Sequence, residues 1–364
     1  MRELFYELSN YYKNNDFENL LNHEYGIYFL KLKSLSRVEL LKKLATKIDL
    51  DITNIPRRQL FEYIFYQKIS DEIIDQFISE IYESQRAIRR ENEDYLYNQL
   101  YRLSVLYWGG FYQNSVEQTI VNNYVKKIQN FDEIVYKIEN DINLRLKGYI
   151  LSSWYNHWAS ILIEDIFKDH SDIIPAIGLV KKIDFFWKNF PFDLKVTYFP
   201  DGYMKYKRKE LGLRPELTEL KQFARKNNIL INKDLNDREL FLDLLTKISE
   251  HTTDSAKRFL KNFYQVRRDI INRTIEKPDD LIRWFYENQG IRRFDSANRF
   301  FIVLIDKSNL EDSWKLKRNR NLLFKNINLF LDRNRNINFD DLKLRFQWNG
   351  RVYTTYATCL FIIN

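Results

Sequence analysis

The chain has 364 residues with 45% hydrophobic, 16% aromatic and 30% charged residues, a length that allows two domains or one large domain with insertions. A single cysteine excludes a disulfide framework and a thiolate metal cluster within the chain, and no apolar run approaches the roughly 18 residues of a membrane span. The formal net charge of +8 suits a polyanionic partner such as DNA, and a solvated basic surface is the alternative.

Residues 1 to about 105 are expected to be helical, and helices resume from Ser115 to about Lys147. Apolar side chains recur at helical spacing, as at Ile73, Ile74, Phe77, Ile78 and Ile81. The first residues lack the apolar segment of a secretory signal, so we expect a cytoplasmic protein with no membrane partner. We assign residues 1–130 to a helical region for DNA recognition or dimer contacts, and residues 131–364 to a second domain.

A helix and two strands are expected between residues 151 and 201. The helix has apolar residues at Trp154, Trp158, Ile161, Leu162 and Ile166. Pro175 ends any helical continuation, and two strands follow, at Ile183–Trp187 and Phe192–Tyr198. Lys188 and Asn189 occupy the turn between them, so the segment is a β-hairpin that follows a helix.

Counting across this hairpin brings two acids together. A loop of two or four residues places Asp184 directly opposite Asp193, with Lys195 on the same face as Asp193. Like charges at opposite positions destabilise a sheet, and a bound cation such as Mg²⁺ is the simplest reason for them. A three-residue loop would separate the acids. In the alternative interpretation, the acids are exposed hairpin ends that pair with Lys182 and Lys195.

This pattern resembles the PD-(D/E)xK signature of restriction-endonuclease-like nucleases. In that signature an acid on one strand precedes an acid-x-Lys on the next, as Asp184 precedes Asp193-Leu194-Lys195 here. Many members also carry a glutamate on the preceding helix, and Glu164 fits that place. The chain departs from the signature in having Ile183 where the proline stands, a position that varies within the superfamily.

The resemblance implies an α/β fold with a restriction-endonuclease-like core, in which a central mixed β-sheet is flanked by helices. That core has the order helix, three strands, helix, strand, and a helix at 278–290 with a buried strand at 300–305 completes it. Residues 203 to about 275 are then a helical insertion. Beyond the core we expect one helix over 312–334 and a hairpin over 342–363 that turns at Asn349-Gly350.

The resemblance also implies the roles of the site residues. Asp184, Asp193 and the backbone carbonyl of Leu194 are expected to bind Mg²⁺, and Lys195 to orient or deprotonate the attacking water. Glu164 would bind a second metal ion, position a water, or do neither. The expected products are a 5′-phosphate and a 3′-hydroxyl.

Basic residues near the hairpin are candidate DNA contacts. They are Lys205, Lys207, Arg208, Lys209, Arg292, Arg293 and Arg299. Similar proteins of this size are mostly type II restriction endonucleases, which cut double-stranded DNA at short sites, and a palindromic site favours a homodimer. Two alternatives remain: a nuclease of the same fold that acts in repair, recombination or phage defence, and a non-catalytic DNA-binding protein whose acids are structural.

Overall fold

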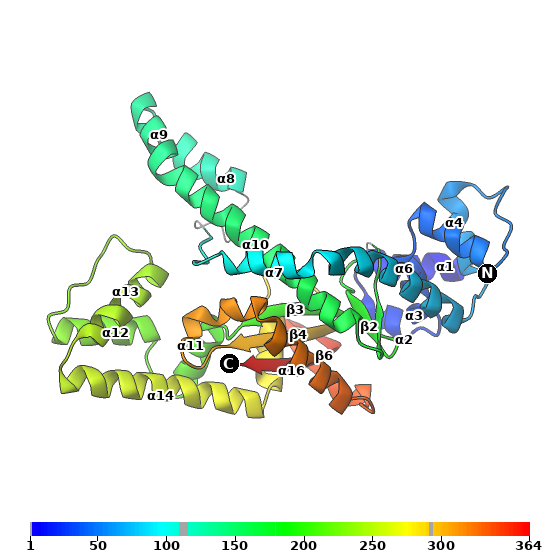
Figure 1. The fold of residues 1–364 in the computed structure, drawn as a ribbon. Coiled ribbons are helices and arrows are strands. Elements are labelled where there is room, and N and C mark those ends of the chain that lie inside the picture. Colours follow the sequence, from blue (N-terminus) through cyan, green and yellow to red (C-terminus); the bar gives the residue numbers. More distant parts are fainter. Residues whose placement is uncertain (1, 109–115, 179, 291–293) are drawn as a thin grey trace.

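The computed structural model describes residues 2–108, 116–178, 180–290 and 294–364, and its helices surround one open β-sheet (Figure 1). The strands are β1 (Ile173–Pro175), β2 (Phe185–Trp187), β3 (Phe190–Tyr198), β4 (Arg299–Ile305), β5 (Lys343–Trp348) and β6 (Arg351–Ile363). Their order in the sheet is β1-β2-β3-β4-β6-β5. β4 runs parallel to β3 and β6, and the other neighbours are antiparallel. An α/β fold with a mixed sheet is therefore confirmed.

The β2–β3 hairpin closes through a two-residue turn. Lys188 and Asn189 both have positive φ angles, 46° and 71°, as a type I′ turn requires. The ladder pairs Phe185 with Phe192, which is the register that a two-residue loop gives. β2 begins two residues later than predicted because Lys182, with a φ of 63°, turns the chain just before it.

The N-terminal helices form a core of their own. They are α1 (Arg2–Lys13), α2 (Phe17–Asn22), α3 (Gly26–Ser34), α4 (Val38–Lys47), the 3-10 turn η1 (Arg57–Gln59), α5 (Leu60–Phe65), α6 (Asp71–Glu91) and α7 (Glu93–Tyr101). Leu8, Leu30 and Leu44 are fully buried in this core, and Ile183 and Phe186 from the β2 segment enter it. The helices predicted for this region are present, and they cover one side of the hairpin.

A long helix connects the sheet to a projecting pair of helices (Figure 1). The elements are α8 (Val116–Ile120), the π-helical turn η2 (Val121–Val125), α9 (Phe131–Lys137), the π-helical turn η3 (Ile138–Ile142) and α10 (Asn143–Lys168). The C-terminal half of α10 packs against the sheet, where Ile163, Ile166 and Phe167 share a core with strands β2, β3 and β4. The N-terminal half of α10 extends away from the sheet.

In the described part of the chain between β3 and β4, which leaves out residues 291–293, there are five helices. They are α11 (Asp201–Glu210), α12 (Glu216–Lys226), α13 (Asp237–Glu250), α14 (Asp254–Glu276) and α15 (Asp279–Glu287). Helices α12, α13 and α14 enclose a separate small core that includes Leu220, Leu244, Ile248 and Phe263. The predicted insertion is therefore helical and has its own apolar interior.

The C-terminal elements surround the fully buried strand β4. They are the 3-10 helix η5 (Leu310–Arg318), α16 (Arg320–Arg333), the 3-10 turn η6 (Phe339–Leu342), and the β5–β6 hairpin. The prediction of one helix over 312–334 was wrong, because Asn319 leaves the helical conformation and its side chain caps α16. The hairpin turn at Asn349-Gly350 is confirmed, with φ angles of 48° and 79°. Among the described residues, no helix has both the length and the apolar character that crossing a membrane requires.

Candidate active site

The structure brings Asp184, Asp193 and Lys195 together at the start of the β2–β3 ladder. The ladder ends at the pair Phe185–Phe192, so Asp184 and Asp193 are the next residues beyond it, and the Asp184 amide donates to the Phe192 carbonyl over 2.8 Å. The Leu194 amide donates to Asp184 Oδ2 over 2.7 Å, and Lys195 Nζ donates to Asp193 Oδ1 over 2.6 Å. Asp193 is 6% exposed, whereas the Lys195 side chain is 47% exposed. The site therefore has one buried acid, Asp193, one partly buried acid, Asp184, and a lysine that reaches solvent.

Two further carboxylates act on Asp184. Burial, together with the negative charges of Glu164 and Asp193, raises the pKa of Asp184 to about 6. The Leu194 amide and the charge of Lys168 oppose that rise. Glu164, on α10, is held by Lys168 one turn later, with 3.0 Å between Nζ and Oε2. Glu164 thus lies within electrostatic reach of the hairpin acids, which is the placement that the sequence predicted.

Arg299 belongs to this site rather than to a DNA-contacting surface. The side chain is buried at the start of β4, where the register pairs Arg299 with Asp193. Its Nε lies 3.6 Å from Asp193 Oδ2, and its Nη2 lies 2.9 Å from Asp295 Oδ1. The guanidinium also covers the ring of Tyr286 at 4.9 Å. The prediction of a direct DNA contact was wrong for Arg299, because its guanidinium is buried and is paired with the carboxylates of Asp193 and Asp295.

The other predicted DNA contacts divide into exposed and internal side chains. Lys205 and Lys209 are exposed on α11 and make no ion pair among the residues that the structure describes. Lys207 bridges Glu210 and Asp280, with distances of 3.0 and 3.2 Å.

Arg208 is a second correction to the predicted DNA contacts. The residue is 1% exposed, and its guanidinium bonds to Glu219 and to the carbonyl of Arg214. The prediction of a direct phosphate contact was therefore wrong for Arg208, since the side chain does not reach the surface. Arg292 and Arg293 lie outside the described residues.

Asp184 and Asp193 both accept hydrogen bonds from other groups of the protein. Within the ranges that the structure describes, no three His, Cys, Asp or Glu side chains form a group arranged to hold a metal ion. Asp184 accepts from the backbone and Asp193 accepts from Lys195, so both carboxylates face protein donors. The donor set nevertheless consists of oxygen ligands, which suit Mg²⁺.

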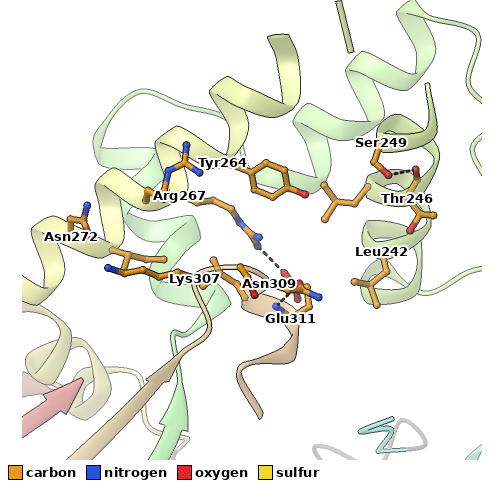
Figure 2. Close-up of a pocket in the computed structure, with 14 residues that line it drawn as sticks. Leu242, Thr246, Ser249, Tyr264, Arg267, Asn272, Lys307, Asn309 and Glu311 are labelled. Carbon is orange, nitrogen blue, oxygen red and sulfur yellow. Dashed lines mark hydrogen bonds and ion pairs between the residues drawn. The ribbon is translucent and has the colours of Figure 1, made fainter. Parts of the chain in front are cut away.

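A cavity lies away from these acids, between α13, α14 and the loop that follows β4 (Figure 2). It has a volume of about 390 Å³, and none of the predicted site residues lines it. Figure 2 shows Arg267 reaching from α14 toward Glu311, with 3.0 Å between Nη2 and Oε1. Arg267 also pairs with Glu216 at 2.8 Å. The Arg267–Glu311 ion pair connects the helical insertion to the loop that follows β4. We assign no catalytic role to these residues.

Comparisons with family models, with curated proteins and with solved structures found no match to this chain. The functional argument therefore depends on the geometry of Asp184, Asp193, Lys195 and Glu164. That geometry includes one feature that the sequence did not reveal, the Arg299 contact to Asp193. The sequence did contain a signal for this contact, because Arg299 begins a predicted strand of the same sheet that contains Asp193.

Proposed function

We propose that this protein is a Mg²⁺-dependent endonuclease that cleaves phosphodiester bonds in double-stranded DNA. The observation that carries the proposal is the gathering of three side chains at the end of the hairpin ladder, where Asp184 accepts from the Leu194 amide and Asp193 accepts from Lys195. The order of elements supports it, because helix α10, strands β1 to β3, helices α11 to α15 and strand β4 follow one another as in the family that the motif resembles.

Asp184, Asp193 and the carbonyl of Leu194 supply the oxygen donors for Mg²⁺ in this proposal. A cation beside Asp184 would offset the negative charges of Glu164 and Asp193, which raise the pKa of Asp184 in the metal-free protein. When bound, Mg²⁺ polarises the scissile phosphate and lowers the pKa of a coordinated water. The chemistry of the donors therefore fits the ion.

The remaining groups act on the water and on the phosphate. The ammonium of Lys195 is half exposed, so it can exchange its bond to Asp193 for contacts with the attacking water and a phosphate oxygen. Glu164 accepts from Lys168 and orients a water or binds a second ion. Arg299 acts as a positioning residue, since its contact to Asp193 helps to fix the carboxylate. Cleavage would leave a 5′-phosphate and a 3′-hydroxyl.

Sequence-specific restriction is the finer form of the proposal. In this form, exposed lysines of α11, Lys205 and Lys209, contact phosphates. The N-terminal helices and the insertion contribute base readout, through Arg or Lys to guanine and Asn or Gln to adenine. A short palindromic site would be cut by a two-fold pair of chains.

The first experiment incubates the purified chain with unmethylated phage DNA and Mg²⁺, beside EDTA, Lys195→Ala and Lys325→Ala. Lys325 is an exposed lysine on α16 and serves as the matched control. Discrete fragments that disappear with EDTA and Lys195→Ala but persist with Lys325→Ala would support restriction. A smear with the same dependence would favour a less specific nuclease. Intact DNA in every lane, with DNA binding retained, would overturn the catalytic proposal in favour of a binding protein.

A further inference from the structure

The cavity of Figure 2 lies between two parts of the fold that have separate apolar cores. Helices α13 and α14 of the insertion form one wall, and the loop of residues 307–311 after β4 forms the other. The insertion packs around Leu244 and Phe263, whereas β4 belongs to the cores of the sheet. Ligand sites form preferentially where two such units meet, and a volume of about 390 Å³ suits a small organic molecule rather than a duplex or a protein.

The charged side chains that line the cavity favour an anion. They are three cations and one carboxylate, Arg267, Arg268, Lys307 and Glu311. Glu311 is already paired with Arg267, with 3.0 Å between Oε1 and Nη2. Arg268 and Lys307 are exposed, and neither makes an ion pair within the described ranges. A positive excess therefore remains on the walls, which attracts a negative ligand and repels a cation.

Arg267 offers a donor to the same space. Its side chain is buried, and its Nε and Nη2 bond to Glu216 and Glu311. The remaining nitrogen, Nη1, has no hydrogen-bond partner among the described residues. Since Arg267 lines the cavity, an oxygen of a bound anion can accept from Nη1 in a charge-assisted hydrogen bond.

The opposite part of the cavity suits a flat apolar ring. Figure 2 shows Lys307 on one side and the α13 residues Leu242, Thr246 and Ser249 on the other, with Tyr264 reaching toward them from α14. The ring of Tyr264 is partly exposed, so a second ring can stack on it. Leu242 gives apolar contact, and the hydroxyls of Thr246 and Ser249 can meet polar atoms at the edge of the ligand.

We propose that this cavity binds a nucleoside phosphate, with its phosphate toward Lys307 and Arg267 and its base on Tyr264. An apolar ligand would leave the cations unpaired, and a bare phosphate would leave the apolar wall uncovered. A free mononucleotide and the terminal nucleotide of a nucleic acid strand share this chemistry. None of the proposed catalytic residues lines the cavity, so the proposal stands whether or not the chain cleaves DNA.

Thermal unfolding and calorimetry of the full chain in EDTA test the site. The probes are the adenosine, guanosine, cytidine and uridine monophosphates, with adenosine and inorganic phosphate as partial ligands. At least one monophosphate is expected to raise the unfolding midpoint with concentration, because a ligand that binds only the folded chain stabilises it. The partial ligands should bind more weakly. Absence of binding by all four monophosphates would overturn the proposal.

Variants locate the binding. Lys307→Gln with Arg268→Gln should weaken the monophosphate at least about tenfold, because charged donors are lost. Tyr264→Ala should weaken it about tenfold through lost stacking. The matched control is Lys257→Gln with Lys261→Gln, two exposed lysines of α14 outside the cavity, and it should bind as the unaltered chain does. Unchanged binding in both cavity variants, or an equal loss in the control, would contradict the site.

A competition experiment separates the two sources of the nucleotide. A tetranucleotide with a 5′-phosphate is compared with the same strand ending in a 5′-hydroxyl. Displacement of the monophosphate by the phosphorylated strand alone would make a strand end the natural ligand. Displacement by neither strand would make it a free nucleotide.

Discussion

Glu164 and Asp165 are neighbours on α10, yet they belong to two different acid clusters. Asp165 is buried and accepts two bonds from Arg89, at 2.8 and 2.7 Å, while Arg86 lies 3.5 Å away. Glu164 accepts from Lys168 and adds its negative charge to Asp184. One cluster joins α6 to α10, and the other gathers beside the β2–β3 hairpin.

The difference between the clusters is charge compensation. In the α6–α10 cluster, Asp165 and Asp169 meet the guanidinium groups of Arg86, Arg89 and Arg90. In the hairpin cluster, Asp193 is paired with Lys195 and Glu164 with Lys168, but Asp184 makes no ion pair with any described residue. Burial, together with the neighbouring acids, raises the pKa of Asp184. Acids that meet several arginines leave no uncompensated charge, whereas the charge of an acid that lies beside other acids can be offset by a cation or a substrate. The hairpin cluster is therefore the better candidate for chemistry.

The largest expected effect is on activity. Under the proposed mechanism, Asp193→Asn should lower the rate of Mg²⁺-dependent plasmid cleavage by at least about 10²–10³-fold, because it removes a proposed Mg²⁺ ligand and the partner of Lys195. Circular dichroism should show that the variant retains its fold. Cleavage at the original rate would place the active site elsewhere.

The α6–α10 cluster should respond in the opposite way. Asp165→Asn should lower the free energy of unfolding by about 3–5 kcal/mol, because Arg89 and Arg86 lose a buried carboxylate. Urea unfolding followed by circular dichroism measures this, with Asp193→Asn as the comparison. A loss below about 1 kcal/mol would show that the arginines find other partners.

The stability of the protein should depend on pH through the carboxyl group of Asp184. Its folded-state pKa of about 6 exceeds the ordinary value of 3.8, so the folded protein without metal loses stability as the pH rises through this interval. Asp184→Asn removes that loss, so in EDTA it should be more stable than the unaltered chain by up to about 3 kcal/mol at pH 7. Near pH 3.5 the two proteins should have the same free energy of unfolding. At pH 7, Mg²⁺ should reduce the difference in stability between them. A gap that does not change with pH would contradict the assigned environment.

The smallest expected effect concerns the basic residues of α11. Lys205→Ala with Lys209→Ala should weaken DNA binding uniformly across sequences and reduce the slope of log affinity against log salt by about 2. Lys207→Ala is the matched control, because Lys207 is already paired with Glu210 and Asp280. Fluorescence anisotropy over a salt series measures the slope. If Lys207→Ala reduced the slope as much as the double variant does, the prediction that only the unpaired lysines contact phosphates would be wrong.

The sequence alone determined the local geometry of the candidate site. Side chains alternate along a strand and a two-residue loop fixes the register, so Asp184 and Asp193 could be paired by counting from Lys188 and Asn189. The same local rules identified the Asn349-Gly350 turn and the fully buried strand β4. These features depend on residues close together in the chain, which is why a pattern can report them.

Only the tertiary structure decided which charges are compensated. Arg89 meets Asp165 from 76 residues away, and Arg299 meets Asp193 across a parallel pair of strands. Arg208 looked like a surface cation, but its neighbour Glu219 comes from the next helix. The exposure of the N-terminal half of α10 likewise follows from where this helix leaves the sheet (Figure 1). A charge or an apolar stripe acquires its role from the groups packed around it, and those groups come from distant parts of the chain.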